Sequence, residues 1–229
     1  MKNKLRTICV GDIHGCLEEF KELLLKIQYN KELDRIILLG DLIDRGDFSA
    51  ETVKFARELN LECVMGNHEF KFLKWFNSNK KIFTKENFYE KLSSEDIDYI
   101  FKMPNYIKIN NFIAVHAGLK AGVSIENQKR EDLLYIRYSD KYGNFISLKD
   151  INKKKSYFWT KFWKGPESII YGHNVHSFSE PLIEEVSTDV ICYGLDTGCC
   201  FGGKLTGLIL ETKELIQVKA KKVYFKSKF

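Results

Sequence analysis

Five apolar segments of this chain each end in a glycine-flanked Asp, Asn or His, and this recurrence constrains the fold more than any other feature. The segments end in VGDIHG, LGDLIDRGD, MGNHE, VHAG and YGHNVH. In an open α/β sheet, sites are built beyond the carboxyl ends of the strands. Glycine lets the backbone turn sharply there without a side-chain clash. We therefore expect these polar residues to meet at one edge of a sheet.

The first third of the chain alternates between strand-like and helix-like patterns. Continuous apolar runs over residues 5–11, 34–40 and 61–66 predict buried strands. Apolar residues at helical spacing predict helices over residues 16–29, 50–60 and 69–76. Strands and helices that alternate at such short intervals are typical of parallel βαβ units covered by helices.

The remainder of the chain predicts more strands than helices. Residues 79–103 are polar and predict an inserted helical segment, and residues 105–118 predict a hairpin that turns at Asn110-Asn111. Residues 119–164 are irregular, lysine-rich and aromatic, and predict a second insertion over one face. The last third predicts short strands in SIIYGH, DVICYGLDTG, KLTGLILET and ELIQVKA. Because no stretch has the composition of a flexible linker, we expect one α/β domain over residues 1–229.

Charge and cysteine content limit the classes of partner. A net charge of +5, with 29% of residues charged, is too mild to indicate a dedicated nucleic-acid binder. The six cysteines form no C-x-x-C pair and lie mostly in apolar runs, which favours a reducing compartment over a disulfide framework. No apolar run approaches membrane-spanning length. We expect a soluble, cytoplasmic protein that binds neither nucleic acid nor membrane.

The polar residues at the strand ends are of the types that hold divalent metals. Oxygen and nitrogen donors suit Mn, Fe or Zn, and the lack of cysteine among them argues against a structural zinc site. Taken singly, each histidine is better explained as an ordinary polar residue, and Asp12 as a helix cap. Four of the five histidines nevertheless follow predicted strands, which favours a joint role. Six candidate ligands suffice for two metal ions, with Asp41 as the candidate bridge: Asp12, His14, Asp41, Asn67, His116 and His173.

These motifs resemble those of the phosphoprotein phosphatase family of metallophosphoesterases, in its small bacterial and phage-like Ser/Thr phosphatase branch. GDIHG, GDLIDRG, GNHE, HAG and YGH match its five signatures in order, between Gly11 and His173. The segment LDTGCCFGGKLTGL, residues 195–208, is similar to the closing strand segment of its small members. The resemblance implies a β-sandwich flanked by helices (αββα), with two inserted helical segments and a pair of metal ions at one edge.

The resemblance also divides the ligands between two divalent ions, for which manganese is expected, with iron or zinc as alternatives. One ion takes the first three candidates, namely Asp12, His14 and Asp41. The other shares the bridging carboxylate and takes the rest, namely Asp41, Asn67, His116 and His173.

The remaining motif residues are expected to serve catalysis. A water held between the ions attacks phosphorus in line. Arg45 is suited to grip phosphoryl oxygens, and Arg137 resembles a second arginine of small bacterial members, its alternative being an ordinary surface arginine. His68 is expected to donate a proton to the departing oxygen, with Asp44 fixing its orientation.

Three hypotheses about activity remain. The first is a Ser/Thr phosphoprotein phosphatase, the second a hydrolase of dinucleoside polyphosphates such as diadenosine tetraphosphate, and the third a metal-holding binding module without turnover. Asp44 favours the first over the second, because the second branch commonly lacks an acid before the motif arginine. Filled ligand, arginine and acid positions disfavour the third. We therefore expect a phosphorylated protein as the substrate, with a nucleotide as the alternative.

Other residues near the motifs are expected to have lesser roles. Glu69 is expected to support the site, and His176 to lie at its rim. Trp159 and Trp163 are expected to cover a core or line the groove wall, and Cys199 and Cys200 to pack.

Overall fold

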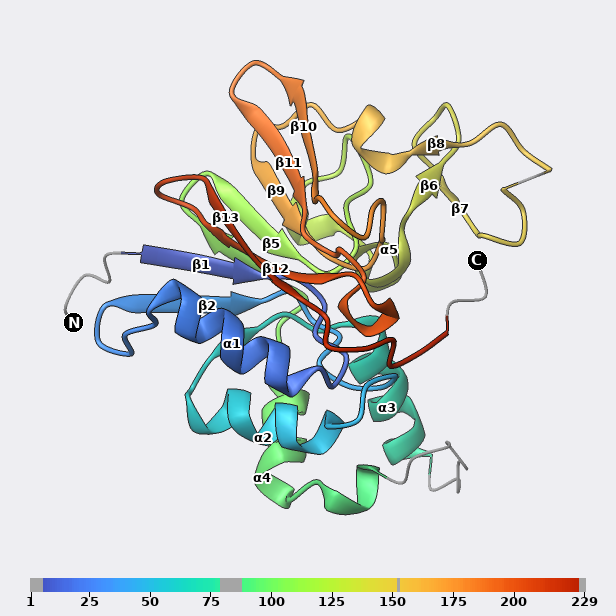
Figure 1. Ribbon diagram of the computed structural model, residues 1–229. Coiled ribbons are helices and arrows are strands. Elements are labelled where there is room, and N and C mark those ends of the chain that lie inside the picture. The colour runs from blue at the N-terminus through green and yellow to red at the C-terminus, as the bar shows by residue number, and fades with distance from the viewer. Residues whose placement is uncertain (1–5, 79–87, 152, 227–229) are drawn as a thin grey trace.

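The computed structural model describes residues 6–78, 88–151 and 153–226. Within this part, two five-stranded sheets form the centre of the molecule (Figure 1). Strands β1, β2 and β3 of the first sheet run parallel, as predicted, and β12 and β13 extend it antiparallel. In spatial order its strands are β13 (Glu214–Lys219), β12 (Lys204–Ile209), β1 (Arg6–Val10), β2 (Asp34–Leu38) and β3 (Glu62–Cys63).

The second sheet has a parallel centre and antiparallel edges. Strands β5, β9 and β11 run parallel, and β4 and β10 pair antiparallel at the two edges. The predicted hairpin is confirmed between β4 and β5, where Asn110 has a φ of +52°, a region that Asn adopts more readily than most residues. In spatial order the strands are β10 (Leu182–Ser187), β11 (Val190–Gly194), β9 (Ser168–Tyr171), β5 (Phe112–Val115) and β4 (Tyr106–Ile109).

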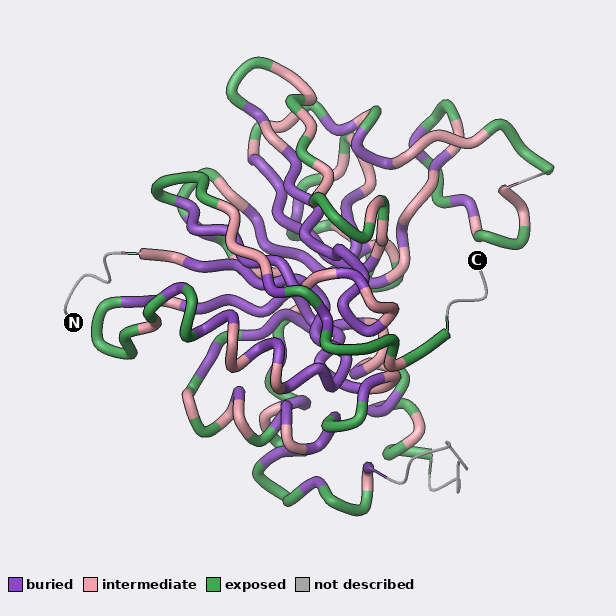
Figure 2. The backbone as a smooth tube through the Cα atoms, in the orientation of Figure 1, coloured by how far each residue is buried: buried purple, intermediate pink, exposed green. Residues whose placement is uncertain are grey.

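The alternation of side chains along the strands explains how the layers stack. Successive strand residues point to opposite faces of a sheet. In β1, Ile8 and Val10 belong to the core beneath the helices, whereas Cys9 packs with Ile170 and Tyr193 of the second sheet. Figure 2 shows buried residues concentrated along these central strands, and exposed residues in the outer loops. The two sheets therefore form a sandwich with a core between them.

Helices cover the outer face of the first sheet (Figure 1). The third of them begins at Asn67, two residues before the predicted start, so the GNHE motif itself forms its first turn. The predicted helical segment over 79–103 lies partly outside the described residues, and its described part contains the short 3-10 helix η1 (Phe88–Lys91) before the fourth helix. The four helices are α1 (Leu17–Ile27), α2 (Ser49–Glu58), α3 (Asn67–Asn77) and α4 (Ser94–Phe101).

The second inserted segment covers the outer face of the second sheet. Trp159 and Trp163 are buried there against Ile113 and Tyr171, which confirms that they cover a core. The layers of helices, two sheets and insertion agree with the predicted sandwich architecture. The described elements of this segment are η2 (Ile125–Asn127), α5 (Arg130–Tyr135), β6 (Tyr138–Ser139), β7 (Phe145–Ile146), β8 (Tyr157–Phe158) and η3 (Trp159–Lys161).

Strand β10 was not among the predicted strands. Its sequence LIEEVS alternates half-buried and exposed residues, so it carries no continuous apolar run. An edge strand with one solvated face needs none. All six cysteines lie in the described part of the chain and are buried free thiols. None of the described helices combines the length and apolar character needed to span a membrane.

Candidate metal centre and adjoining cavity

The carboxyl ends of strands from both sheets bring the predicted ligands together. Asp12 and His14 follow β1, Asp41 follows β2, His116 follows β5, and His173 follows β9. Asn67 opens α3, which follows β3 after a short connection. Contacts cross between the sheets: the backbone N–H of His173 donates to both carboxylate oxygens of Asp12, at 3.0 and 3.1 Å.

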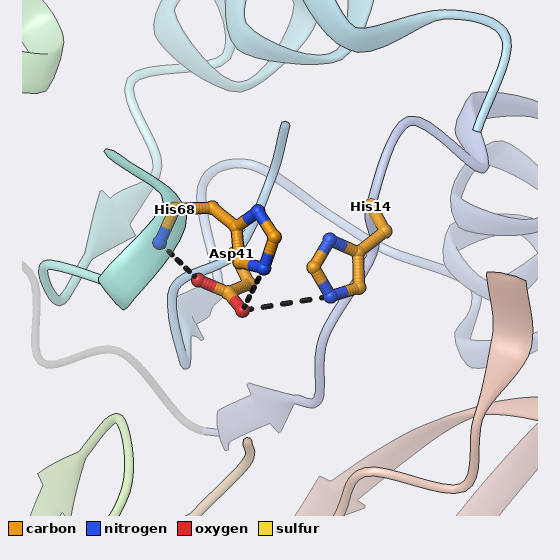
Figure 3. A group of neighbouring side chains, drawn as sticks. All are labelled: His14, Asp41 and His68. Carbon is orange, nitrogen blue, oxygen red and sulfur yellow. Dashed lines mark hydrogen bonds and ion pairs between the residues drawn. The ribbon is translucent and has the colours of Figure 1, made fainter. Parts of the chain in front are cut away.

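Asp41 lies at the centre of the group. Its Oδ2 atom is 3.5 Å from Nε2 of His14 and 3.8 Å from Nε2 of His68 (Figure 3). Its Oδ1 atom is 3.5 Å from Nε2 of His116 and accepts a hydrogen bond from the backbone N–H of His68. The Asp41 carboxylate therefore faces two groups of histidines, as a bridging ligand would.

Backbone carbonyls fix the tautomers of two ligand histidines. Nδ1 of His14 lies 2.8 Å from the carbonyl oxygen of Ile43, and Nδ1 of His116 lies 2.7 Å from that of Leu39. A carbonyl can only accept, so Nδ1 carries the proton in both rings. Their Nε2 lone pairs therefore point into the cluster, the arrangement usual for metal-binding histidines.

The donor set fits a bound cation. Nε2 of His116 lies 2.9 Å from Oδ1 of Asn67 and 3.1 Å from Nδ1 of His173. Since the proton of His116 is on Nδ1, its Nε2 and the Asn67 oxygen are both acceptors. Among the described residues, the buried Nε2 of His173 has no hydrogen-bond partner. A divalent ion would satisfy such converging acceptors.

Burial keeps the ligand imidazoles neutral. Burial lowers the pKa of His14 and of His173 well below the usual value, and the positive charges of Arg45 and Arg137 respectively lower them further. Burial lowers the pKa of His116 as well. Neutral imidazole is the form that binds a metal. The cluster is therefore prepared for metal ligation at neutral pH.

His68 and Asp44 form a pair beside this cluster. Nδ1 of His68 lies 2.6 Å from Oδ2 of Asp44, and its Nε2 lies 3.3 Å from Nη2 of Arg45. Burial alone would lower the pKa of His68, but the charges of Asp41 and Asp44 outweigh it and raise that pKa. His68 is thus more readily protonated than an isolated imidazole and can act as a proton donor.

Both predicted arginines border a cavity next to the cluster. The cavity has a volume of about 530 Å³, and Arg45, Arg137, His173 and Asp196 are among its lining residues. Nη2 of Arg137 donates to the carbonyl oxygen of His173 at 3.0 Å, which holds this arginine at the cavity rather than on the open surface. The structure thus gathers every residue predicted for the site.

Comparison with known proteins identifies the family. The model of the calcineurin-like phosphoesterase family matches residues 5–203. The chain belongs to this family. Calcineurin-like phosphoesterases use divalent metals, which agrees with the converging His and Asp side chains.

Relatives of this phosphoesterase match nearly its whole length. The asymmetrical bis(5'-nucleosyl)-tetraphosphatase PrpE of Oceanobacillus iheyensis is 30% identical over 96% of this chain and 94% of its own length. The symmetrical bis(5'-nucleosyl)-tetraphosphatase of Baumannia cicadellinicola is 27% identical over 95% of this chain and 94% of its own. The solved structure of a "putative diadenosine tetraphosphatase" superposes with a TM-score of 0.82, at 25% identity, over 96% of this chain and 95% of that one.

These relatives overturn the predicted Ser/Thr phosphoprotein phosphatase activity, and with it the phosphorylated protein as substrate. The prediction was wrong because it used Asp44 to choose between branches. Asp44 contacts His68 beside the cluster. A carboxylate that orients this histidine says little about whether a peptide or a nucleoside is attached to the phosphate.

Two buried acids of this phosphoesterase matter more than the sequence indicated. Glu69, expected only as support, accepts the backbone N–H groups of Asp41, Leu42 and Ile43 at 2.8, 2.8 and 3.2 Å. It therefore shapes the loop that presents the central carboxylate. Asp196 was not predicted, although it follows β11 in YGLDTG, just as other site residues follow their strands. It lines the cavity, and burial raises its pKa to about 6.

The two cysteines predicted to pack and the histidine predicted to lie at the rim are found in those places. Cys199 and Cys200 are buried in the core beneath the helices, and His176 lies at the exposed rim of the cavity. Two aromatic residues that line the same cavity, Phe178 and Phe201, were not predicted as site residues.

Proposed function

We propose that this chain hydrolyses the polyphosphate bridge of bis(5'-nucleosyl) tetraphosphates such as diadenosine tetraphosphate. The observation that carries the proposal is the match with tetraphosphatases over nearly the whole length of both chains. The TM-score of 0.82 with the structure titled "putative diadenosine tetraphosphatase" supports it. A cavity with two arginines beside the cluster suits a substrate with several anionic phosphates.

We propose two divalent ions, manganese first, as the cofactor. When bound, the ions would acidify a water and neutralise charge on the phosphates. Asp41, which faces histidines on both sides, would belong to both ions. The remaining ligands would divide into Asp12 and His14 for one ion, and Asn67, His116 and His173 for the other.

The chain's own residues would bind the phosphates and move a proton. Arg45 and Arg137 each offer a planar fork of donors that matches phosphoryl oxygens. His68, held by Asp44 at 2.6 Å, would protonate the bridging oxygen as the bond to phosphorus breaks. The departing nucleotide is a weaker base than a serine alkoxide, so this proton matters less than in a protein phosphatase.

The test is product analysis after incubation of diadenosine tetraphosphate with the protein and Mn²⁺. Symmetrical cleavage gives two ADP, and asymmetrical cleavage gives ATP and AMP. A phosphoserine peptide serves as the comparison substrate. The proposal fails if the dinucleotide stays intact while the peptide or p-nitrophenyl phosphate releases phosphate.

Metal analysis tests the cofactor separately. Protein purified without added ions, then dialysed against Mn²⁺, should hold two ions per chain. A stoichiometry of one would contradict the bridging role of Asp41.

A further inference from the structure

The cavity beside the cluster has two chemically different ends. Arg45, Arg137, His173 and Asp196 line the end nearest the cluster. Of the remaining lining residues, Asn174, His176 and Ser177 are polar. The apolar ones, which are half-buried or exposed and are here called the apolar wall, are Tyr138, Leu148, Val175, Phe178 and Phe201. Single exposed apolar residues are common on protein surfaces. That general rule does not explain why several exposed apolar residues lie together in the cavity that also contains Arg45 and Arg137.

A chain of contacts leads from the cluster to the apolar end. Arg45 lies within hydrogen-bond distance of His68, and its guanidinium carbon is 5.0 Å from the ring centre of Phe201. The ring centre of Phe201 is in turn 6.5 Å from that of Phe178. A phosphate held by the arginine would therefore have aromatic rings along its path out of the cluster.

The backbone holds Phe178 in this place although half of the side chain is exposed. Phe178 lies in the loop between β9 and β10, and it is 51% exposed. Its ring lies over Gly198, where an added Cβ would come within 2.6 Å of the ring and where φ is +69°. A glycine is thus needed at this position for the ring to lie as it does. The ring is anchored on one side and open on the other.

We infer that Phe178 and Phe201 form the stacking surface for a nucleobase of the substrate, with the attached phosphates directed to Arg45 and Arg137. This inference rests on the proposed function and adds to it the part of the protein that distinguishes a nucleotide from other phosphate esters. Every nucleobase presents a flat aromatic face, and stacking on protein aromatic rings is a recurrent way to bind it. A phosphate chain without a base would use only the arginine end.

The first experiment measures binding rather than turnover. Isothermal titration with Mn²⁺ present gives the affinities of ADP and of inorganic pyrophosphate for the protein and for Phe178→Ala. Because the variant lacks a ring on which the base would stack, ADP should bind to it about tenfold more weakly, and pyrophosphate equally well. Phe178→Tyr should restore ADP binding. Phe101→Ala, which removes a similarly exposed ring from α4, is the control and should change neither affinity.

The second experiment compares diadenosine tetraphosphate with inorganic tetraphosphate as substrates. Phe178→Ala should raise KM about tenfold for the dinucleotide only, with kcat little changed. Equal effects on the ligands with and without a base, or no effect on either, would overturn the inference. If the dinucleotide is not hydrolysed but ADP affinity still depends on Phe178, the proposed function fails and the base-binding surface stands.

Discussion

The inner cluster around Asp41 and the apolar wall of the adjoining cavity are built in different ways. Residues of the inner cluster are largely buried and follow β-strands within a few positions. Residues of the apolar wall come from a long loop, a 3-10 turn (η4, Cys199–Phe201) and the second inserted segment, and are half-buried or exposed. The inner cluster comprises Asp12, His14, Asp41, Asn67, His116 and His173, and the apolar wall Tyr138, Leu148, Val175, Phe178 and Phe201.

This difference separates chemistry from substrate choice. Metal ligands must meet within a few ångströms, which rigid strand ends achieve. The part of the substrate beyond the phosphates is recognised by the outer surface, where loops can vary while the sheet stays the same. An assignment of substrate from the inner cluster alone was therefore wrong, although the family was predicted correctly.

The largest effect should come from Asp41→Asn. The change removes the negative charge that faces both groups of histidines, so bound metal should fall and hydrolysis should become undetectable. Metal analysis and product assay of the same preparation measure both effects. Asp98→Asn, which changes an exposed carboxylate paired with Lys102 on α4, is the matched control and should keep both properties. An Asp41→Asn protein that retains two ions would contradict the central role of this carboxylate.

His68→Asn should lower kcat by about 10²-fold, the low end for loss of a proton donor because the departing nucleotide is a weak base, while metal content holds. Metal analysis beside kinetics separates the two cases. If metal is lost with activity, His68 belongs to the ligand set, since it lies in one of the two groups around Asp41.

The pH profile tests the partner of His68 independently. The charge of Asp44 helps to raise the pKa of His68, so Asp44→Asn should lower that pKa. Activity that needs protonated His68 falls as pH rises through its pKa. The alkaline limb of kcat should therefore move to lower pH in Asp44→Asn. An unchanged limb would show that another group titrates there.

The fold and inner cluster were predictable because their signals are local. In a segment such as VGDIHG, six residues include both the end of a strand and the candidate metal ligands that follow it. Because parallel strands share one orientation, their ends meet without any further information about the rest of the chain. Asp41 could be recognised in this way, and so could His116 from the opposite sheet.

The apolar wall could not be predicted because its residues depend on distant contacts. The chain has 17 phenylalanines, and no periodicity distinguishes Phe178 from the others. Its position is set by Gly198, a residue 20 positions further along, and by Phe201. The edge strand β10 was not predicted because its acidic, partly exposed sequence LIEEVS lacks the continuous apolar run by which the other strands were recognised.

Glu69→Gln should destabilise the protein, because Glu69 holds the loop that carries Asp41. One carboxylate oxygen accepts from Asp41 and the other from Leu42 and Ile43, and an amide nitrogen in either place would oppose an N–H group. A buried group left unpaired costs about 1–3 kcal/mol, which denaturant unfolding can measure. Glu62→Gln breaks an exposed pair with Arg35 and should cost less than about 1 kcal/mol. Equal losses in the free energy of unfolding would show that the buried carboxylate of Glu69 contributes no more to stability than the exposed one of Glu62.

The smallest effect concerns a carboxylate outside both regions. Burial raises the pKa of Asp12 in the inner cluster well above the usual value. The pKa of Asp96, which lies in α4, is shifted in the opposite direction. Burial of Asp96 is outweighed by hydrogen bonds from Arg57 and Ser93, so its pKa lies below the usual value. Asp96 also completes the capping box of α4 with Ser93. Asp96→Ala should therefore lower Tm by about 2–4 °C at pH 7.

The sign of the pH dependence distinguishes Asp96 from Asp12 of the inner cluster. A lowered pKa means that the contribution of Asp96 is present above the unfolded value near 3.8 and is lost as pH falls through the folded value. The difference in Tm between the protein and Asp96→Ala should therefore stay constant above about pH 4 and shrink as the pH falls below it. For Asp12 in metal-free protein the raised pKa gives the opposite sign, and Asp12→Asn should raise Tm at pH 7, because the charge is buried without a metal. If both substitutions lower Tm equally, the inner cluster is stabilised by its own hydrogen bonds, and the ions are not needed to offset its buried charge.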